Sequence, residues 1–414
     1  MFVDLTPEQK ALRKEIRAYF NQIMTEEIRI ALRREDGHER HEAYKNLCRQ
    51  MGKDGWLAVG WPKEYGGRGY TPIEQLIFFE EVFIAGATLP FVTVNTVGPA
   101  LMAHGSEEHK KKFLPGIAAG ELHFAIGYTE GNAGTDLATL STSAVLEGDH
   151  FVVNGSKLFT SDAESADYIW LACRTNPEEK RHKGISILIV DTKAPGYSLT
   201  PIHTVGHRTN ATYYDNVKVP ASMLVGQLNG GWKLITAQLN HERVGLGAFG
   251  VKATAAFQKV LTWAKTADAS GRRAVDEPWV RRALAESYSQ IEAMRLLNYR
   301  LSSDITAGRM DVGLASASKV YGSETMIAVF RRLLEIVGMG GLYRLGSPAA
   351  ELKALLEDNA PYQAKVTFEG LSSATGWNAP DTAPWFEQAL NTASQAHFGA
   401  PCGYPAPGGT IPLM

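Results

Sequence analysis

The stretch YTEGNAGTDLATLSTSAVLEGDHFVVNGSKLFTS, residues 128–161, marks the point where this chain changes from helical to strand patterning. It opens with a polar, glycine-rich turn and continues as two strands that carry the turn dipeptides Gly148-Asp149 and Asn154-Gly155. Both dipeptides are typical of β-hairpin turns, and Asn-Gly is the strongest short hairpin signal. Because a mainly helical protein carries one such block of strands in its middle, we expect the block to hold a ligand.

The part of the chain before the strands is patterned as helices. Residues 6–33 repeat apolar side chains at helical spacing and predict one helix with Thr6 as its N-cap. Ser106 is expected to cap a later helix, which Pro115 should interrupt because proline removes a backbone donor and clashes with the preceding turn. This part predicts an N-terminal helical domain.

After residue 123 the signal is that of short strands between turns, which predicts a compact antiparallel barrel or sandwich. Helical periodicity returns at Trp232, where a long helix is expected to run to residue 264. The order of helices, strands and helices argues for segregated domains rather than alternating strands and helices. The expected divisions are 1–122 (N-terminal helices), 123–229 (strands), 230–371 (C-terminal helices) and 372–414 (an extended or poorly ordered tail).

Composition excludes several classes of protein. The chain has 414 residues, 44% hydrophobic and 21% charged, with a formal net charge of -2, which is ordinary for a globular protein. No global field directs it to nucleic acid or an anionic membrane. Three widely spaced cysteines predict neither a disulfide framework nor a metal site. Without a signal peptide or a spanning apolar run, the expectation is a cytoplasmic protein that does not enter a membrane.

The glycine-rich turn of residues 128–136 is neither a P-loop nor a GxGxxG dinucleotide loop. Taken alone, it can be a structural loop between strands. The functional alternative is that backbone N–H groups and the hydroxyls of Thr129, Thr135 and Ser161 converge on a polar ligand.

Two glutamates are candidates for proton transfer. Glu242 and Arg243 lie in LNHERVGLGAFG, where three glycines follow inside an expected helix and indicate that something packs close to its backbone. A solvated Glu-Arg pair is the simpler interpretation, but apolar neighbours would bury the carboxylate, raise its pKa and make it a plausible general base. Glu369, in VTFEGLSS, is more simply explained as the end of a helix or strand.

Several segments together resemble one family, the flavin-dependent acyl-CoA dehydrogenases, over roughly residues 5–370. The matching segments are GWPKEYGGRG, YTEGNAGTDLATL, VVNGSKLFTS, ADYIWLACRT, GISILIVDT, DNVKVP and LNHERV. The resemblance is nearest to actinobacterial members that act on steroid side-chain CoA thioesters in cholesterol catabolism and assemble as α2β2 heterotetramers. It implies an α+β multidomain fold with an N-terminal helical domain, a middle antiparallel β-barrel domain and a C-terminal four-helix bundle.

The resemblance also implies a site for FAD between the β-domain and the C-terminal bundle. By motif position, Thr129 should bond the flavin ring, while Phe159 and Ser161 should supply an aromatic face and a hydroxyl near its reactive nitrogen. Thr135 should contact cofactor phosphate or substrate. The full set of cofactor-binding residues implied is Ile126, Tyr128, Thr129, Thr135, Phe159 and Ser161.

The implied reaction is the α,β-dehydrogenation of an acyl-CoA thioester to the 2,3-enoyl-CoA, a step of β-oxidation in lipid metabolism. A carboxylate removes the α-proton while the flavin accepts a hydride from the β-carbon and later passes the electrons to an electron-transfer acceptor. Glu242 matches the base position of some family members, and Arg243 should orient that region electrostatically. Other members carry the base near the C-terminus, close to Glu369, which is the less favoured candidate here.

Three departures from the family pattern concern assembly. The loop AKTADASGRRAVDE lacks the Arg-x-x-Phe-Gly motif with which many homotetrameric members reach a neighbour's FAD. Glu335 stands where a glutamine usually meets that cofactor, and the usual sequence after Gly370 is missing. A homologous partner subunit in an α2β2 heterotetramer is therefore expected. The alternatives are a non-catalytic subunit that completes a partner's FAD site, and a flavin oxidase or monooxygenase on the same fold.

Overall fold

The structure is a computed structural model, and the chain divides into two compact units, Met1–Ile336 and Val337–Met414. The elements given below begin within the first unit. The residues that the structure describes are 4–33, 37–179, 181–204, 208–236, 238, 248–267, 271–309 and 311–338.

The N-terminal part is helical, as predicted, but its first helix is shorter than expected. The chain leaves the helix at Met24, and the side-chain oxygen of Thr25 accepts a hydrogen bond of 3.3 Å from the Ile28 amide, so a second helix begins there. The helices are α1 (Pro7–Ile23), α2 (Glu26–Arg33), α3 (Gly37–Lys53), α4 (Pro72–Ala85), α5 (Gly98–His104) and α6 (Glu107–Ala118), with short turns η1 (Lys63–Tyr65) and η2 (Thr93–Val97).

The predicted interruption of the last of these helices is wrong. Ser106 caps α6 as expected, but Pro115 lies inside the helix, which continues to Ala118. Proline removes only one backbone hydrogen bond, and the buried side chains of Leu114 and Ile117 on either side of it hold the last turn against the core. Tertiary packing therefore outweighs the local signal.

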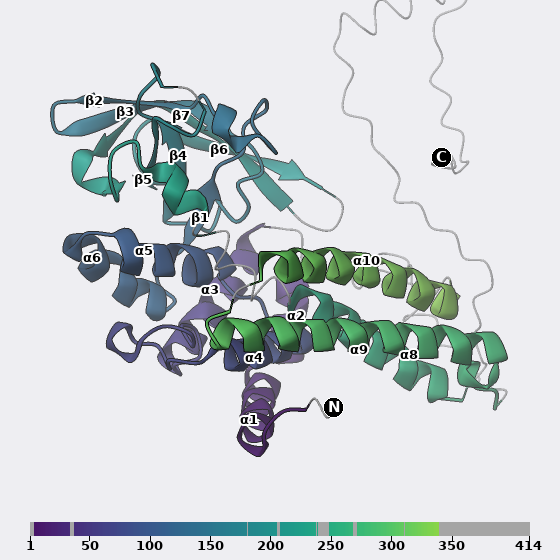
Figure 1. Ribbon diagram of the computed structural model, residues 1–414. Coiled ribbons are helices and arrows are strands. Elements are labelled where there is room, and N and C mark those ends of the chain that lie inside the picture. Colours follow the sequence, from purple (N-terminus) through teal and green to yellow (C-terminus); the bar gives the residue numbers. More distant parts are fainter. Residues whose placement is uncertain are drawn as a thin grey trace, which may run out of the picture. The chain divides into compact units, whose positions relative to one another are not determined.

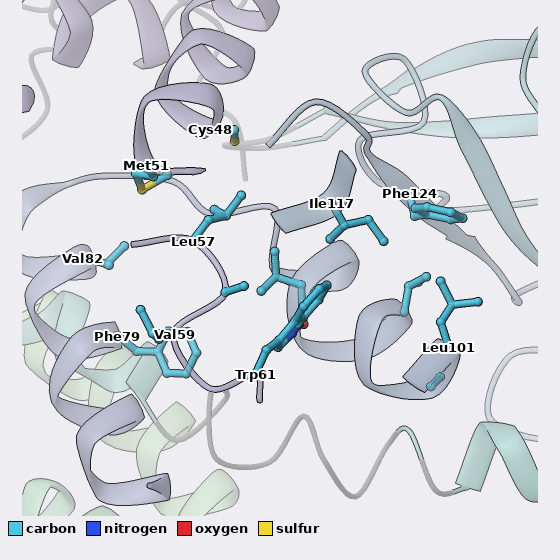
Figure 2. Close-up of a cluster of buried hydrophobic side chains, with 14 of the residues drawn as sticks. Cys48, Met51, Leu57, Val59, Trp61, Phe79, Val82, Leu101, Ile117 and Phe124 are labelled. Atoms are coloured by element: carbon cyan, nitrogen blue, oxygen red, sulfur yellow. The ribbon is translucent and has the colours of Figure 1, made fainter. Parts of the chain in front are cut away.

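One hydrophobic core joins these helices to the first strand. Figure 2 shows some of the core side chains, which come from α3, the loop between α3 and α4, α4, α5, α6 and the strand that begins at Phe124. Trp61, on the loop between α3 and α4, donates a 2.8 Å hydrogen bond from its indole nitrogen to the carbonyl of Val94 in η2. The first half of this loop therefore belongs to the core, where Trp56, Leu57 and Val59 are buried together with Trp61.

The middle of the chain forms one eight-stranded sheet (Figure 1), with hydrogen-bonded order β6-β7-β3-β2-β4-β5-β8 and β1 beside β4. Most pairs are antiparallel, but β1 and β2 both pair with β4 in parallel. The strands are β1 (Phe124–Gly127), β2 (Ser143–Glu147), β3 (His150–Lys157), β4 (Tyr168–Arg174), β5 (Ile185–Asp191), β6 (Tyr197–His203), β7 (Arg208–Pro220) and β8 (Leu224–Val225).

Of the two predicted hairpin turns, one is confirmed and one is wrong. Gly148 and Asp149 connect β2 to β3, whereas Asn154 and Gly155 lie inside β3. Gly155 has a φ of 144°, and a Cβ there would lie 2.7 Å from the hydroxyl oxygen of Thr142. The glycine is required for a close approach of two backbones rather than for a turn.

The C-terminal part is helical again. Residues 231–236 are helical, and α8 (Lys252–Lys265), α9 (Pro278–Thr306) and α10 (Val312–Val337) share a core of their own and lie side by side in Figure 1. In the described part of the chain, no helix is long and apolar enough to cross a membrane. The middle of the predicted 232–264 helix and the predicted tail lie outside the described residues, and the domain boundaries stay predictions.

Candidate active site

The chain leaving β1 is tied to the end of β3 by hydrogen bonds to two backbone carbonyls. The Leu158 amide donates a 2.8 Å hydrogen bond to the carbonyl of Thr129, and the Lys157 ammonium donates one of 3.1 Å to the carbonyl of Tyr128. The first and the last parts of the 128–161 stretch therefore lie next to each other. This places Thr129 beside the segment after β3, which carries two other expected flavin-facing residues, Phe159 and Ser161.

A buried ion pair fixes this junction. The Lys157 side chain is 0% exposed, and its ammonium lies 2.7 Å from Oε1 of Glu130. Oε1 also accepts from the Thr142 amide at 2.9 Å, and Oε2 accepts from the amide and the hydroxyl of Ser141 at 2.7 Å each. Every oxygen of the carboxylate is thus paired, which is the condition for a buried charge to be tolerated.

The electrostatics keep this pair ionised. Burial on its own raises the pKa of Glu130, but the nearby Lys157 charge and the hydrogen bonds that the carboxylate accepts outweigh it and lower the pKa to about 2. Burial lowers the pKa of Lys157, and the Glu130 charge opposes that shift. The result is a charged clamp that holds the turn after β1 against β3.

The segment after β3 presents an aromatic ring to solvent. Phe159 has a left-handed φ of 57° and is 59% exposed, both unusual for phenylalanine. The neighbouring residues hold it there, because the Thr160 amide donates to the Asn210 carbonyl at 2.9 Å. The Ser161 and Thr209 hydroxyls are 3.1 Å apart. An exposed, strained aromatic residue on a well-anchored segment is a candidate contact for a planar ligand.

The remaining expected cofactor residues lie at or after β1. Ile126 is half-buried within the strand, and Thr135 is exposed in the loop that follows it. Tyr128 is held by a side-chain network: its hydroxyl accepts a 3.2 Å hydrogen bond from the Trp170 indole and donates one to Oε1 of Gln238. Ile126 itself pairs with Trp170 in the sheet.

The structure adds residues to the candidate site but does not describe the candidate bases. Glu242, Arg243 and Glu369 lie outside the described residues, so their roles stay predictions. The reasoning from sequence missed the Glu130–Lys157 pair and the polar residue Gln238. A lysine at an inward position of the alternating β3 pattern, where Phe151 and Val153 are buried, was the available signal for a buried charge.

Comparison with known proteins identifies the family along nearly the whole chain. Family models for the N-terminal, middle and C-terminal domains of acyl-CoA dehydrogenase match residues 6–121, 125–217 and 229–363. Among solved structures, the ChsE4-ChsE5 complex from Mycobacterium tuberculosis matches with a TM-score of 0.77 and 48% identity, covering 84% of this chain and 89% of that one. The complex described as "Tcur3481-Tcur3483 steroid ACAD" matches with a TM-score of 0.78 and 47% identity, covering 88% and 96%.

Curated relatives agree with the family models. Acyl-CoA dehydrogenase FadE29 of Mycobacterium tuberculosis is 50% identical over 378 residues, which are 89% of this chain and 94% of that protein. FadE26 of the same organism is 48% identical over 371 residues, 86% and 91% of the two chains. The expected helical, sheet and helical domains of this fold are confirmed. The chain therefore belongs to the acyl-CoA dehydrogenase family, whose members are FAD-dependent oxidoreductases.

Proposed function

We propose that this chain is the catalytic subunit of an enzyme that introduces a 2,3 double bond into an acyl-CoA thioester. The observation that carries the proposal is the junction of β1 and β3, where the Glu130–Lys157 clamp holds Thr129 beside the segment with the exposed, strained Phe159. In a chain of this family, such a junction suits a flat, redox-active ligand with polar edges.

The residues at this junction fit FAD. An exposed aromatic ring, Phe159, and the hydroxyls of Thr129 and Ser161 suit the apolar face and the polar edge of a flavin. In the described part of the chain, the amide nitrogen of Gln238 is buried without a hydrogen-bond partner, as expected where a ligand supplies the acceptor. When bound, FAD supplies the two-electron acceptor that takes a hydride from the β-carbon of the substrate.

The chain's own contribution to the reaction is a base. The α-proton of a thioester is weakly acidic, and a carboxylate with a raised pKa can remove it as the hydride leaves the neighbouring carbon. Glu242 is the proposed base because LNHERV matches the family's base segment, and Arg243 is proposed to orient the region electrostatically. Ile126, Tyr128 and Thr135 are proposed to complete the contacts to the cofactor or the substrate.

Replacing the base tests this assignment. Glu242→Gln keeps the shape of the side chain and should slow anaerobic reduction of the flavin by acyl-CoA by at least 10²–10⁴-fold, with FAD still bound. Glu369→Gln, at the less favoured candidate, is the matched control and should leave the rate unchanged. If the Glu242→Gln enzyme has a normal turnover rate, Glu242 is not the base. The alternative of a non-catalytic subunit that completes a partner's FAD site then gains support.

The substrate class we propose is a steroid whose side chain is activated as a CoA thioester. The support is the 47% identity to a complex described as a steroid acyl-CoA dehydrogenase. A steroid side-chain CoA thioester should reduce the flavin faster than butanoyl-, octanoyl- and palmitoyl-CoA. The reduced flavin should pass electrons to an artificial acceptor in preference to O₂, because rapid reaction with O₂ would instead indicate an oxidase or monooxygenase.

We also propose that the chain works with a homologous subunit in an α2β2 assembly. The ChsE4-ChsE5 and Tcur3481-Tcur3483 structures are both complexes of two different proteins. On α10, the exposed side chains of Val320, Ile327 and Leu334 are spaced by seven residues and so share one face. The native mass and the ratio of FAD to chain test this, and a stable homotetramer with one FAD per chain would contradict it.

A further inference from the structure

Three side chains from separate parts of the fold form a hydrogen-bonded chain beside the proposed flavin site. Trp170 lies on β4, Tyr128 follows β1, and Gln238 follows the helical residues 231–236. The Trp170 indole nitrogen lies 3.2 Å from the Tyr128 hydroxyl, which also bonds Oε1 of Gln238. Trp170 is fully buried and Gln238 is 4% exposed. These contacts hold the oxygen end of the Gln238 amide.

The direction of the bond between Trp170 and Tyr128 follows from the chemistry of the groups. An indole nitrogen can only donate, so the Tyr128 hydroxyl uses a lone pair to accept from Trp170. In the structure that hydroxyl donates its single hydrogen to Oε1 of Gln238. The Gln238 amide is therefore held with its NH₂ group turned away from Tyr128, and each bond of the chain polarises the next.

This NH₂ group has nothing to bond within the part of the chain that the structure describes. Nε2 of Gln238 is buried and lacks a hydrogen-bond acceptor. A buried donor without an acceptor is destabilising, and native proteins rarely retain one without a functional reason. An amide that is oriented by two other side chains and left without an acceptor is preorganised for a group that arrives later.

We propose that Gln238 is a positioning residue whose amide N–H groups donate to a carbonyl oxygen of a molecule bound next to Tyr128. The inference rests on the proposed function, in which Thr129, the residue after Tyr128, faces the flavin and Glu242, four residues after Gln238, is the base. Two carbonyl sources belong to that reaction: the flavin ring and the substrate thioester. Both accept a hydrogen bond from a neutral amide, so the experiment separates them.

The test uses the assembled complex with its partner subunit. Gln238→Met keeps the length of the side chain without its polar groups, whereas Gln238→Glu keeps an acceptor for Tyr128 but replaces the NH₂ donor with an acceptor. Gln227→Met is the matched control, because Gln227 is exposed. The two binding measurements are FAD titrated into flavin-free complex and acetoacetyl-CoA titrated into flavin-loaded complex. Acetoacetyl-CoA carries the thioester carbonyl but is not a substrate for dehydrogenation.

Loss of one hydrogen bond predicts a dissociation constant that rises about 3- to 10-fold in Gln238→Met, for one of the two ligands. Gln238→Glu should be weaker still, because it turns an acceptor toward a carbonyl, and a merely structural role would not produce that order. A change confined to FAD assigns the flavin carbonyl, and a change confined to acetoacetyl-CoA assigns the thioester. Unchanged binding of both ligands in both variants overturns the proposal.

Tyr128→Phe gives a second, milder test that keeps the ring in place. It removes the bond that orients the amide, so it should weaken the same ligand as Gln238→Met, by a smaller factor. An effect on the other ligand alone contradicts the proposed chain of bonds. A wild-type complex that binds neither FAD nor acetoacetyl-CoA removes the proposed function itself, whereas normal binding by wild type and variants removes only the role of Gln238.

Discussion

Two buried glutamates in this chain have opposite electrostatics. Glu130, at the junction of β1 and β3, has both oxygens paired. Burial raises its pKa, but the Lys157 charge and the hydrogen bonds that the carboxylate accepts outweigh this effect and lower the pKa to about 2. Glu80, on α4, is also buried, but burial raises its pKa to about 7 against the opposing charges of Arg13 and Arg295. Both have cationic neighbours, so the presence of a partner does not explain the difference.

Glu80 is more deeply buried than Glu130, and it also has fewer paired oxygens. Oε2 of Glu80 bonds Arg13 from α1 and accepts from the Tyr299 hydroxyl of α9 at 3.3 Å, but Oε1 has no partner in the described part of the chain. The adjacent Glu81 takes the Arg17 guanidinium at two distances of 2.8 Å and adds a like charge beside Glu80. A buried carboxylate keeps its charge when every oxygen has a donor, and an incomplete set leaves burial dominant.

The strongest test of this comparison removes the cation from the fully paired site. Lys157→Met leaves Glu130 buried without its counter-charge and should lower the free energy of unfolding by about 3–5 kcal/mol. Urea unfolding of the flavin-free protein measures the change. The double variant Glu130→Gln, Lys157→Met should recover part of the loss, because no unpaired charge is buried, although the single amide oxygen can accept from only one of the Ser141 and Thr142 amides. A double variant as unstable as the single one would show that the charge is not the cause.

The pH dependence of stability is the next test, and the two glutamates predict opposite signs. The pKa of Glu80 is raised, so its stabilising contribution is full below about pH 4.5 and is lost as the pH rises to about 7, a change of about 3 kcal/mol. The pKa of Glu130 is lowered, so its contribution is present above about pH 4.5 and is lost as the pH falls to about 2.

Glu80→Gln isolates the first of these windows. The variant cannot ionise, so the fall in unfolding midpoint between pH 4.5 and 7 should flatten while the loss below pH 4.5 remains. In Glu130→Gln, the loss below pH 4.5 should flatten while the fall between pH 4.5 and 7 remains. Thermal unfolding of both variants across pH 3 to 8 measures the two slopes. An unaltered slope above pH 4.5 in Glu80→Gln would mean that Glu80 is not the group that titrates there.

The sequence predicts the order of the elements and the candidate flavin-facing residues, but it predicts neither of the two buried glutamate sites. The helical, strand and helical order follows from periodicity, and the residues around Thr129, Phe159 and Ser161 follow from motifs that are local in sequence. The Glu130–Lys157 pair spans 27 residues, and the contact between Glu80 and Tyr299 spans 219. Neither pairing leaves a periodic signal, because each depends on which elements pack together, which only the fold decides.

The failures of local prediction have the same cause. Asn154-Gly155 satisfies the chemistry of a hairpin turn, yet the dipeptide lies inside β3, where Asn154 bonds the amide of Asn216 at 2.9 Å and Gly155 admits Thr142. A glycine allows a turn and equally a close approach of two strands, and the sequence does not say which of these is used. Thr142 also donates its amide to Glu130, so this glycine belongs to the paired site.

Gly155→Ala therefore tests the Glu130–Lys157 pair indirectly, through Thr142. The new methyl group would overlap Thr142 and displace a donor of Glu130, so we expect a loss of about 2 kcal/mol in the free energy of unfolding. The acid loss of stability should also become smaller and level off at a higher pH, since fewer donors then hold the carboxylate and its pKa in the folded protein is lowered less. Gly148 also has a positive φ, but its value of 63° is less restrictive for alanine than the 144° of Gly155, and the space around its Cβ is open. Gly148→Ala should therefore cost less and leave the loss of stability at acid pH unchanged.

The smallest expected effect comes from an ion pair of the same kind at the surface. The Lys110 ammonium lies 2.9 Å from a carboxylate oxygen of Glu107, three residues earlier on α6, and Glu107 is exposed. Lys110→Met makes the same substitution as Lys157→Met and keeps the apolar stem, but water and salt already screen the pair. The unfolding midpoint should not move measurably. A loss as large as that of Lys157→Met would mean that pairing itself, rather than the need to satisfy a buried carboxylate, sets the cost at both sites.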